Sequence, residues 1–463
     1  MFLLLKGDLD NRLDPLFYSE DIFKFLKITS FAIKKIREIC TFAKSGFGAG
    51  KQDQNLEGKG VIQIRPTNMD ENGLLKFDRN VYIPENYLET NNAYVLSKED
   101  VLFNNTNSQE WVGKTAYFKE EGTFLHSNHV TVLQVDKNII QPKYLWILLN
   151  IYQQKKIFYN ICTNWNNQSG VGIDRLLSLK IPVPSLETQQ IIINIFEKAY
   201  ALKKEKEAQA KDLLASIDDY LLKSLGIVFP EKVKANSIFF THFKNVQGDR
   251  FDPFYHKVEF DILETSIKNG LYPIQKMGVF LSQINYGASV KSDYVEFGIP
   301  FLRISDLERN EIDLSEMKYL PESMKKDIGN AIVYENDFLI SRSGTIGVVA
   351  RVGKEFNGFA YGSFMIKFCL KDDALIEKDY LSFFLNCGLM QKIIIRNKIG
   401  AIQGNITIPT IKNFEIPLPP LSIQNEIAEH IRGIRATAKA LENEAKEILE
   451  QAKAEVERMI LGE

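Results

Sequence analysis

Two closely similar segments, KIPVPSLETQ (residues 180–189) and EIPLPPLSIQ (residues 415–424), decide how this 463-residue chain folds. Each is followed by a long stretch without proline, and proline commonly fixes the chain where a helix opens. The second segment begins 235 residues after the first, at residue 415 rather than 180. We therefore interpret the chain as one unit of about 215 to 235 residues that is written twice.

Four further pairs of segments recur in the same order at nearly the same offset. They are NRLDPLFY (11–18) with DRFDPFY (249–255), IRPTNM (64–69) with LRISDL (302–307), DVLFNNTN (100–107) with DFLISRSG (337–344), and YLWILLN (144–150) with YLSFFLN (380–386). Matches in one order along the chain are hard to attribute to chance. They predict a pseudo-twofold internal repeat.

The stretches 187–225 and 422–461 have the composition of long helices. In the second, apolar residues recur at spacings of three and four, at Ile427, Ile431, Ile434, Ala438, Leu441, Ala445, Ile448, Ala452, Val456 and Met459. A noisier stripe in the first comprises Ile191, Ile195, Ala199, Leu202, Leu213, Ile217, Tyr220 and Leu225. Such near-heptad spacing is typical of a coiled coil. Since neither helix can bury its stripe alone, we expect the two to form an antiparallel pair.

The first part of each copy alternates short Val, Ile, Phe and Tyr runs with Gly, Asn, Asp and Ser turns, as small mixed domains do. The predicted fold class is α+β, with two mixed α/β domains joined by two long helices in an antiparallel coiled coil. The expected boundaries are a first domain at 1–185, a helix at 186–226, a linker at 227–248, a second domain at 249–420 and a helix at 421–463.

Composition excludes several classes of protein. Hydrophobic residues make up 45% of the chain, and no apolar run reaches the roughly 20 residues of a membrane span, so we expect a cytoplasmic location. The cysteines, at 40, 162, 369 and 387, are too scattered for a zinc site and are expected to be free thiols. The net charge of −2 means that any surface facing nucleic acid must be a local basic patch.

The order of domain, helix, domain and helix resembles the specificity subunit of type I restriction-modification systems, over residues 11–463. The doubled IPxPxLxxQ segment, the RFDP-type opening and the turns DVLFNNTNSQEWVGKTA (100–116) and FLISRSGTIGVVARV (338–352) carry the resemblance. It implies that each domain is a target-recognition domain for one half of a split double-stranded DNA site. It also implies that the helices space the domains and dock two methyltransferase subunits, which restriction (motor-nuclease) subunits join in DNA methylation and phage defence.

Chemistry is not expected in this chain, because no Asn-Pro-Pro-Tyr type methyltransferase motif is present. SGFGAGK (45–51) approaches a phosphate-binding loop, but Ser45 stands where Gly is needed and Gln52 where Ser or Thr is needed. We therefore expect no cofactor, no metal and no catalytic residue. The resemblance implies S-adenosylmethionine, ATP and Mg²⁺ on the partner subunits.

The candidate DNA contacts lie in polar loops between predicted strands, since Asn and Gln pair well with adenine and Arg and Lys with guanine. In the first copy they are Gly48, Lys51, Gln52, Asn105, Asn107, Asn128, Asn166 and Gln168. In the second they are Tyr286, Ser289, Lys291, Arg342, Tyr361, Ser363, Gln403 and Asn405. Gly48 and Ala49 are matched with Gly287 and Ala288 as a tight loop near DNA. Asn-rich loops are also simply good turns.

The candidate docking residues for the methyltransferase subunits are Ile191, Ile195, Ile427 and Ile431 on the two helices. Two other functions stay open at the level of sequence. One is an interaction scaffold that does not bind DNA, and the other is the specificity subunit of a related system that lacks a type I motor. A fused restriction-methylation enzyme is excluded, because two repeats leave no room for its catalytic domains.

Overall fold

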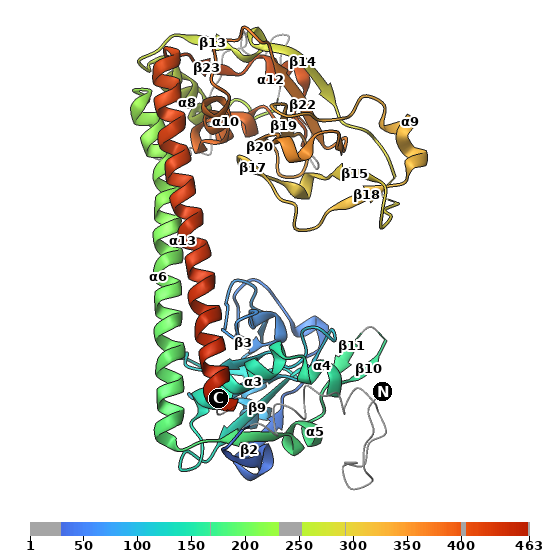
Figure 1. Cartoon of the computed structure of the whole chain (residues 1–463), viewed down its shortest axis with the longest axis vertical. Coiled ribbons are helices and arrows are strands. Elements are labelled where there is room, and N and C mark those ends of the chain that lie inside the picture. The colour runs from blue at the N-terminus through green and yellow to red at the C-terminus, as the bar shows by residue number, and fades with distance from the viewer. Residues whose placement is uncertain (1–28, 167, 231–251, 292, 400–403, 462–463) are drawn as a thin grey trace. The chain divides into compact units, whose positions relative to one another are not determined.

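The computed structural model describes residues 29–166, 168–230, 252–291, 293–399 and 404–461 (Figure 1). The opening motif at 11–18, residues 231–248 of the expected linker, and Gln403 lie outside this range. Contacts divide the chain into two compact units. The first unit comprises residues up to 207 together with residues from 442, and the second unit comprises residues 208–441.

Two long helices, α6 (Leu186–Ser224) and α13 (Leu421–Leu461), contribute to both units. In the first unit, the opening half of α6 packs with the closing half of α13, and Lys206 pairs with Glu444 at 2.9 Å. In the second unit the remaining halves pack together, and the rings of Tyr220 and His430 lie 3.9 Å apart. The antiparallel coiled coil is therefore confirmed.

The apolar stripe of α13 is close to the predicted one. Its buried members are Ile427, Ile431, Ala438, Ala445, Ala452 and Val456, while Ile434, Leu441, Ile448 and Met459 are half-buried. The predicted stripe of α6 is wrong at Ile191 and Leu202, whose side chains are exposed. The first turns of α6 instead bury Ile192, Ile193 and Phe196 against the core of the first unit.

The core of the first unit lies between a four-stranded antiparallel sheet and α3 (Pro142–Gln154). The sheet has the order β2 (Cys40–Ser45), β9 (Val130–Val135), β5 (Val101–Asn104) and β7 (Thr115–Tyr117). A second sheet has the order β4 (Tyr82–Ile83), β3 (Val61–Ile64) and β8 (Phe124–His126), with β3 and β8 parallel. The β-branched and aromatic residues of these strands form the interior of the first unit.

Shorter elements complete the first unit. They are β1 (Ala32–Lys35) with β12 (Lys180–Val183), the sheet of β10 (Thr163–Trp165), β11 (Gln168–Gly170) and β6 (Thr106–Asn107), and the helices α2 (Tyr87–Thr90), α4 (Ile157–Ile161) and α5 (Ile173–Ser178).

The second unit repeats this plan. Its four-stranded sheet has the order β14 (Leu281–Tyr286), β22 (Met365–Leu370), β19 (Phe338–Ser341) and β20 (Val349–Arg351), and it packs on α10 (Lys378–Asn386). Its three-stranded sheet has the order β18 (Lys318–Leu320), β15 (Ile299–Leu302) and β21 (Ala360–Tyr361), with β15 and β21 parallel. The remaining elements are α8 (Val258–Lys268), β13 (Ile274–Lys276) with β23 (Glu415–Pro417), β16 (Leu307–Glu308) with β17 (Glu311–Ile312), α9 (Lys325–Ile328), α11 (Gly388–Arg396) and α12 (Ile408–Lys412).

Equivalent side chains make equivalent hydrogen bonds in the two units, which confirms the internal repeat. Gln189 and Gln424, the last residues of the two deciding segments, are fully buried. Gln189 Nε2 donates to the carbonyl oxygens of Ile139 and Pro184, and Gln424 Nε2 donates to the corresponding oxygens of Leu375 and Pro419. Each glutamine thus fastens the start of a long helix to its domain.

The asparagine that ends the YLWILLN and YLSFFLN segments has a matching role. Asn150 accepts a hydrogen bond from the Thr115 amide, and Asn386 accepts one from the Val349 amide. Each asparagine therefore joins the main helix to the last strand of the four-stranded sheet. Because these groups are buried, their removal would leave unpaired amides.

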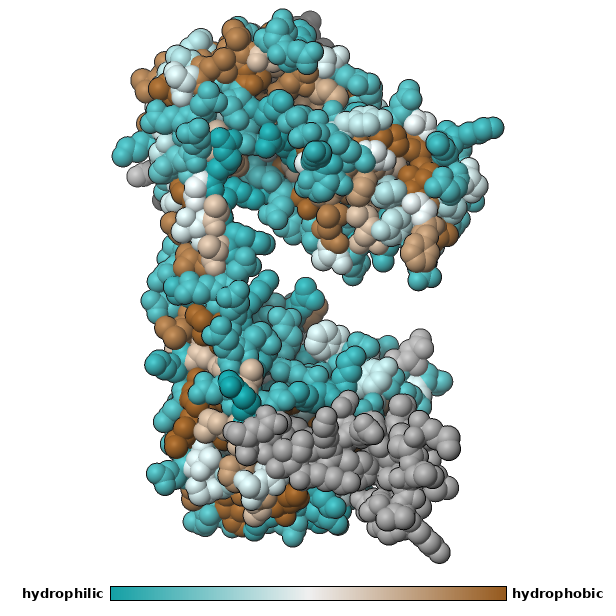
Figure 2. Space-filling model, viewed as in Figure 1, coloured by the Kyte–Doolittle hydropathy of each residue, from teal (hydrophilic) through white to brown (hydrophobic). Residues whose placement is uncertain are grey.

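The surface in the view of Figure 2 is predominantly hydrophilic, with smaller hydrophobic patches. None of the described helices has the length and apolarity that a membrane crossing requires. All four cysteines are free thiols. Within the described ranges, no cluster of His, Cys, Asp or Glu has the geometry of a metal site.

Candidate nucleic-acid interface

A glycine at the end of the first sheet strand lets two loops meet in each unit. The amide of Gly46 donates to Val130, and the amide of Gly287 donates to Met365. A Cβ at Gly46 would lie 2.1 Å from the His126 carbonyl oxygen, and one at Gly287 would lie 2.2 Å from the Gly362 carbonyl oxygen. Gly46 is therefore the equivalent of Gly287, and the predicted match with Gly48 is wrong by two residues.

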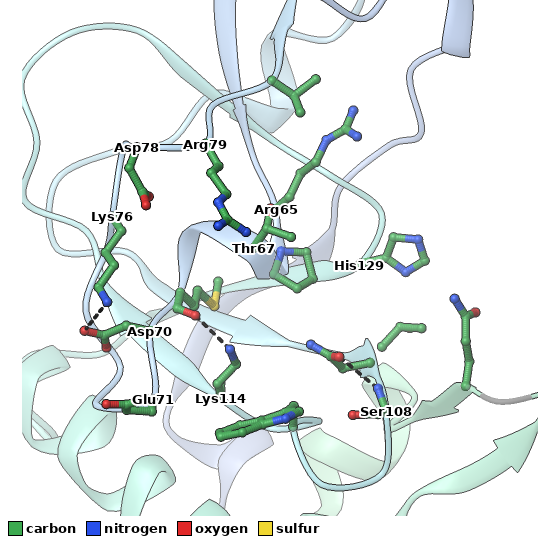
Figure 3. A pocket seen from close by; sticks show the side chains of 17 residues that line it. Arg65, Thr67, Asp70, Glu71, Lys76, Asp78, Arg79, Ser108, Lys114 and His129 are labelled. Atoms are coloured by element: carbon green, nitrogen blue, oxygen red, sulfur yellow. Dashed lines mark hydrogen bonds and ion pairs between the residues drawn. The ribbon is translucent and has the colours of Figure 1, made fainter. Parts of the chain in front are cut away.

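The loops of the first unit surround an open cavity of about 780 Å³ (Figure 3). Its cationic lining residues are Arg65, Lys76, Arg79 and Lys114, with His129 beside them. Asp70, Glu71 and Asp78 line one side. The cationic groups of the cavity can bind DNA phosphates. Its amide side chains can form hydrogen bonds with base edges.

The small sheet of β10, β11 and β6 brings two predicted contacts to this cavity. Asn107 of β6 pairs with Ser169 of β11, and both Asn107 and the exposed Gln168 line the cavity. Asn166 lies in the turn before β11, with an exposed side chain and a φ of 38°. Residues distant in sequence thus meet at one edge of the domain.

Lys114 and Arg65 are held in fixed positions. The Lys114 ammonium donates to the Met69 carbonyl oxygen at 2.7 Å, and burial lowers the pKa of Lys114. Arg65 donates from its two terminal nitrogens to Gln54 and Gln63, at 3.0 and 2.9 Å. Burial, followed by the charge of Arg65, lowers the pKa of His129. His129 is therefore held toward its neutral form, in which one ring nitrogen accepts a hydrogen bond.

The glycine-rich loop of the first unit contributes an exposed surface. Gly48, Lys51, Gln52 and Asn128 are all exposed. Lys51 and Gln52 lie in a three-residue 3₁₀ turn, so no long helix follows the glycines, as the rejection of a phosphate-binding loop predicted. Gly48 faces Asn128, whose side chain lies 3.6 Å from a Cβ built at the glycine.

The corresponding edge of the second unit is built around Arg342 and Tyr286. The Arg342 guanidinium lies over the Tyr286 ring, 4.6 Å from its centroid. Ser343 bridges to Asn405, as β6 pairs with β11 in the first unit. Of these predicted contacts, Tyr286, Ser289 and Lys291 are exposed, and Arg342 and Ser363 are half-buried.

Two predicted contacts are corrected by their burial. Tyr361 is fully buried, and its hydroxyl faces the Asn285 and Tyr286 carbonyl oxygens. Its partner in the parallel pair is Leu302, as Ile64 is the partner of His126, so Tyr361 corresponds to an interior strand residue. Asn105 is 8% exposed, and its Nδ2 donates to Ser45, Asn128 and Thr131.

The candidate docking residues on the long helices differ in the exposure of their side chains. Ile427 and Ile431 are 1% and 0% exposed in the core of the second unit, so their side chains cannot reach a partner without disrupting that core. Ile195 is half-buried and packs against the core of the first unit. Ile191 is 47% exposed and is the member of the set that stays available.

Sequence reasoning missed Lys76, Arg79 and Lys114 as lining residues of the cavity. Lys76 and Arg79 lie outside the repeated motifs, in a loop that runs between β3 and β4. Lys114 lies in the 100–116 turn, but beyond the polar cluster that was matched with the second repeat. The loop directly after the matched Arg65 segment carries Asp70, Glu71 and Asp78 beside its two cations, so its net charge gave no signal. Sequence alone does not indicate that this loop folds back toward β6.

Because His126 is buried, we expect the free energy of unfolding to fall at acidic pH. The Nδ1 of His126 donates to the Val130 carbonyl oxygen at 3.1 Å, and burial lowers its pKa to about 4. An unfolded histidine titrates near 6.5, so below that pH the unfolded state gains a proton that the folded state refuses. The stability present above about pH 6.5 is lost as the pH falls toward 4, by about 2 kcal/mol at pH 5. Denaturant unfolding of the wild type and of His126→Gln, each above about pH 6.5 and at about pH 5, measures this loss of stability. The loss should be smaller in the variant, and an equal loss would contradict the role assigned to His126.

Comparison with known proteins agrees with this architecture. The family model of the type I restriction modification DNA specificity domain matches residues 29–212 and again residues 261–451. The chain belongs to this family. Its specificity domain therefore occurs twice, once for each repeat deduced from the sequence.

Relatives of this specificity family match along most of the chain. The chain is 24% identical over 458 residues to a protein named as the type I restriction enzyme MjaX specificity subunit of Methanocaldococcus jannaschii, covering 96% of this chain and 97% of that protein. It is 23% identical to the EcoKI specificity subunit of Escherichia coli, covering 83% and 78%. A solved chain from a study of assembly and conformational transition in the type I R-M system has a TM-score of 0.52 at 16% identity, covering 93% and 96%, and supports the fold.

Proposed function

We propose that this chain is the DNA-recognition subunit of a type I restriction-modification complex and reads a bipartite site, one half with each unit. The observation that supports this most is the repeated framework, in which matching side chains hold domains whose loops differ. A shared scaffold with different loops is what two half-sites of different sequence require. The specificity family to which the chain belongs supports the same function.

Base reading in the first unit is assigned to the exposed amides and cations around the cavity. Asn107 and Gln168 have the donor and acceptor pair that matches adenine, and Arg65 and Arg79 have the paired donors that match guanine. Gly48, Lys51, Gln52, Asn128 and Asn166 flank this surface. In the second unit the assigned residues are Tyr286, Ser289, Lys291, Arg342, Ser363, Gln403 and Asn405.

Two methyltransferase subunits are proposed to dock at the beginnings of the long helices. Leu186 and Leu421 open α6 and α13 at equivalent positions, and they are 40% and 41% exposed. A repeated apolar residue at the surface suits two copies of one partner. Ile191 extends this surface on α6. Restriction subunits would then join through the methyltransferase.

The chain is proposed to be non-catalytic by itself. S-adenosylmethionine, ATP and Mg²⁺ are assigned to the partner subunits, whose activities are adenine methylation, translocation and cleavage. Of the seven charged side chains that line the cavity of the first unit, four are cationic and three are carboxylates. The cationic groups suit binding of an anion such as a DNA phosphate.

Sequencing of N6-methyladenine in host DNA tests the proposal. Cells that express the chain with its methyltransferase partner should methylate one split motif, and cells that express the methyltransferase alone should not. The purified complex should also shift a duplex that carries the motif at lower concentration than a scrambled duplex. If no split motif is methylated and neither duplex is bound, the chain is an interaction scaffold.

A further inference from the structure

We propose that the two units place their DNA-contacting arginine at non-equivalent positions, Arg65 in the first and Arg342 in the second. The inference rests on the proposed function, because it assumes that both units bind DNA. It concerns two positions that the repeat makes comparable. At each position one unit has an arginine that forms no ion pair with the described residues, and the other has a side chain whose hydrogen bonds or charge are satisfied within the protein.

Arg65 and Arg303 occupy the first of these positions. Each follows the central strand of a three-stranded sheet, β3 or β15, and precedes a 3₁₀ turn. The backbone amide of Arg65 donates to Asn68 at 3.0 Å, and that of Arg303 donates to Asp306 at 2.8 Å. The backbone geometry is therefore shared, and the difference lies in the side chain three residues later.

Arg303 is neutralised inside the protein. Its Nε and one terminal nitrogen donate to the two carboxylate oxygens of Asp306 at 3.1 and 2.5 Å, and Glu316 lies 3.8 Å from the other terminal nitrogen. A bidentate pair of this kind uses an N–H edge of the guanidinium that would otherwise meet a guanine or a phosphate. In the second unit this arginine therefore stabilises the domain itself.

Arg65 has no such partner, because the corresponding residue is the neutral Asn68. Asn68 uses its own amide to hold the Lys76 carbonyl and Asn80. Arg65 is held instead by two glutamines, and Gln63 is fixed in turn by a bond to the Phe47 carbonyl oxygen. Within the described residues no carboxylate forms an ion pair with Arg65, so its charge is oriented but not cancelled.

The second position reverses the pattern. The carbonyl oxygen of Asn105 accepts from Val171, and that of Arg342 accepts from Ile406, so the two residues are equivalent. The Asn105 side-chain amide donates to Ser45, Asn128 and Thr131 within the protein. Arg342 stacks on Tyr286, and among the residues described it forms no ion pair. Stacking fixes the plane of a guanidinium while its N–H edge stays available.

The expected ligand at Arg65 and at Arg342 is a pair of hydrogen-bond acceptors on DNA. Both the O6 and N7 edge of guanine and a phosphate group present such a pair. A guanine contact would act on sequence preference, whereas a phosphate contact would act on affinity for every sequence. The two half-sites would in either case be engaged by different loops of the shared framework.

The test compares Arg65→Ala, Arg342→Ala and the combined change Arg303→Ala with Asp306→Asn. The last removes both members of the internal pair, so that no carboxylate is left alone. Each full-length variant is assembled with the methyltransferase partner and assayed on the wild-type methylated motif and on duplexes with one half-site scrambled. Circular dichroism melting reports whether each variant is folded, and Lys198→Ala on the exposed face of α6 is the charge-matched control.

Arg65→Ala and Arg342→Ala should each weaken binding about tenfold or more, through different half-sites, while the Arg303 pair and Lys198→Ala should bind as wild type does. Loss of preference at one base pair would identify a guanine contact. A uniform loss, with a salt dependence lowered by about one ion, would identify a phosphate contact. Wild-type binding by folded Arg65→Ala and Arg342→Ala, or an equal loss in the Arg303 pair variant, would overturn the inference. A wild-type complex without any split motif would overturn the proposed function instead.

Discussion

Replacing Ile431 with aspartate should lower the free energy of unfolding by roughly 3 to 5 kcal/mol, because it places an unpaired carboxylate in an apolar core. Ile431 is fully buried, in the cluster that also holds Leu221 of α6 and Phe384 of α10. The change therefore separates α13 from both the other long helix and its own domain. Denaturant unfolding followed by circular dichroism measures the loss.

Two matched variants make the result specific to burial. Ala436→Asp adds the same charge at an exposed position of the same helix and should change stability by no more than about 0.5 kcal/mol. Ile431→Val should cost about 0.5 to 1.5 kcal/mol. The same aspartate at the half-buried Ile434 should cost less than at Ile431. Equal stability of Ile431→Asp and Ala436→Asp would contradict the assigned packing.

Lengthening both long helices by four residues should widen the unread gap of the DNA site by one or two base pairs. The insertions belong after Ala208 in α6 and after Leu441 in α13, where the two units divide. Four residues add about 6 Å and nearly preserve the 3.6-residue phase, so each half of the coiled coil should keep its packing. Sequencing of the methylated motif measures the new gap.

A single insertion provides the control. With four residues added to α6 alone, the two helices become unequal in length between the same two units, and the pairing must break in one of them. We expect that variant to lose stability and methylation, and the paired insertion to restore both. A restored activity with an unchanged gap would refute the spacer role of the helices, and altered half-site bases would refute the independence of the two units.

The helices and the repeat could be predicted because their physical causes are local. An apolar residue at every third or fourth position requires a buried stripe, and the stripe of α13 is found where the spacing placed it. The stripe of α6 failed at Ile191 because two surfaces compete for that helix. Its first turns pack Ile192, Ile193 and Phe196 on the domain core, and no spacing rule distinguishes a domain from a second helix.

The candidate interface could be predicted only in part. Asn107 and Gln168 were predicted because polar residues interrupt strands there, and both line the cavity of the first unit, while their contact with DNA stays a prediction. Tyr361 was assigned wrongly, and Gly48 was wrongly matched with Gly287, because an alignment of two short motifs slips easily by one or two residues. The backbone bonds of Gly46 and of the β3–β8 and β15–β21 pairs fix the correct register. Arg79 and Lys114 come together only through the folding of a long loop.

The closing half of α13 has a consequence for the synthesis of this protein. Leu449, Val456 and Ile460 belong to the core of the first unit, yet the ribosome adds them only after all of residues 208–441. The first domain to emerge must therefore wait with an unfilled apolar surface while the second domain is made. Such a surface attracts chaperones and invites aggregation during that interval. A nonsense mutation near residue 442 would accordingly harm the earlier domain more than the later one.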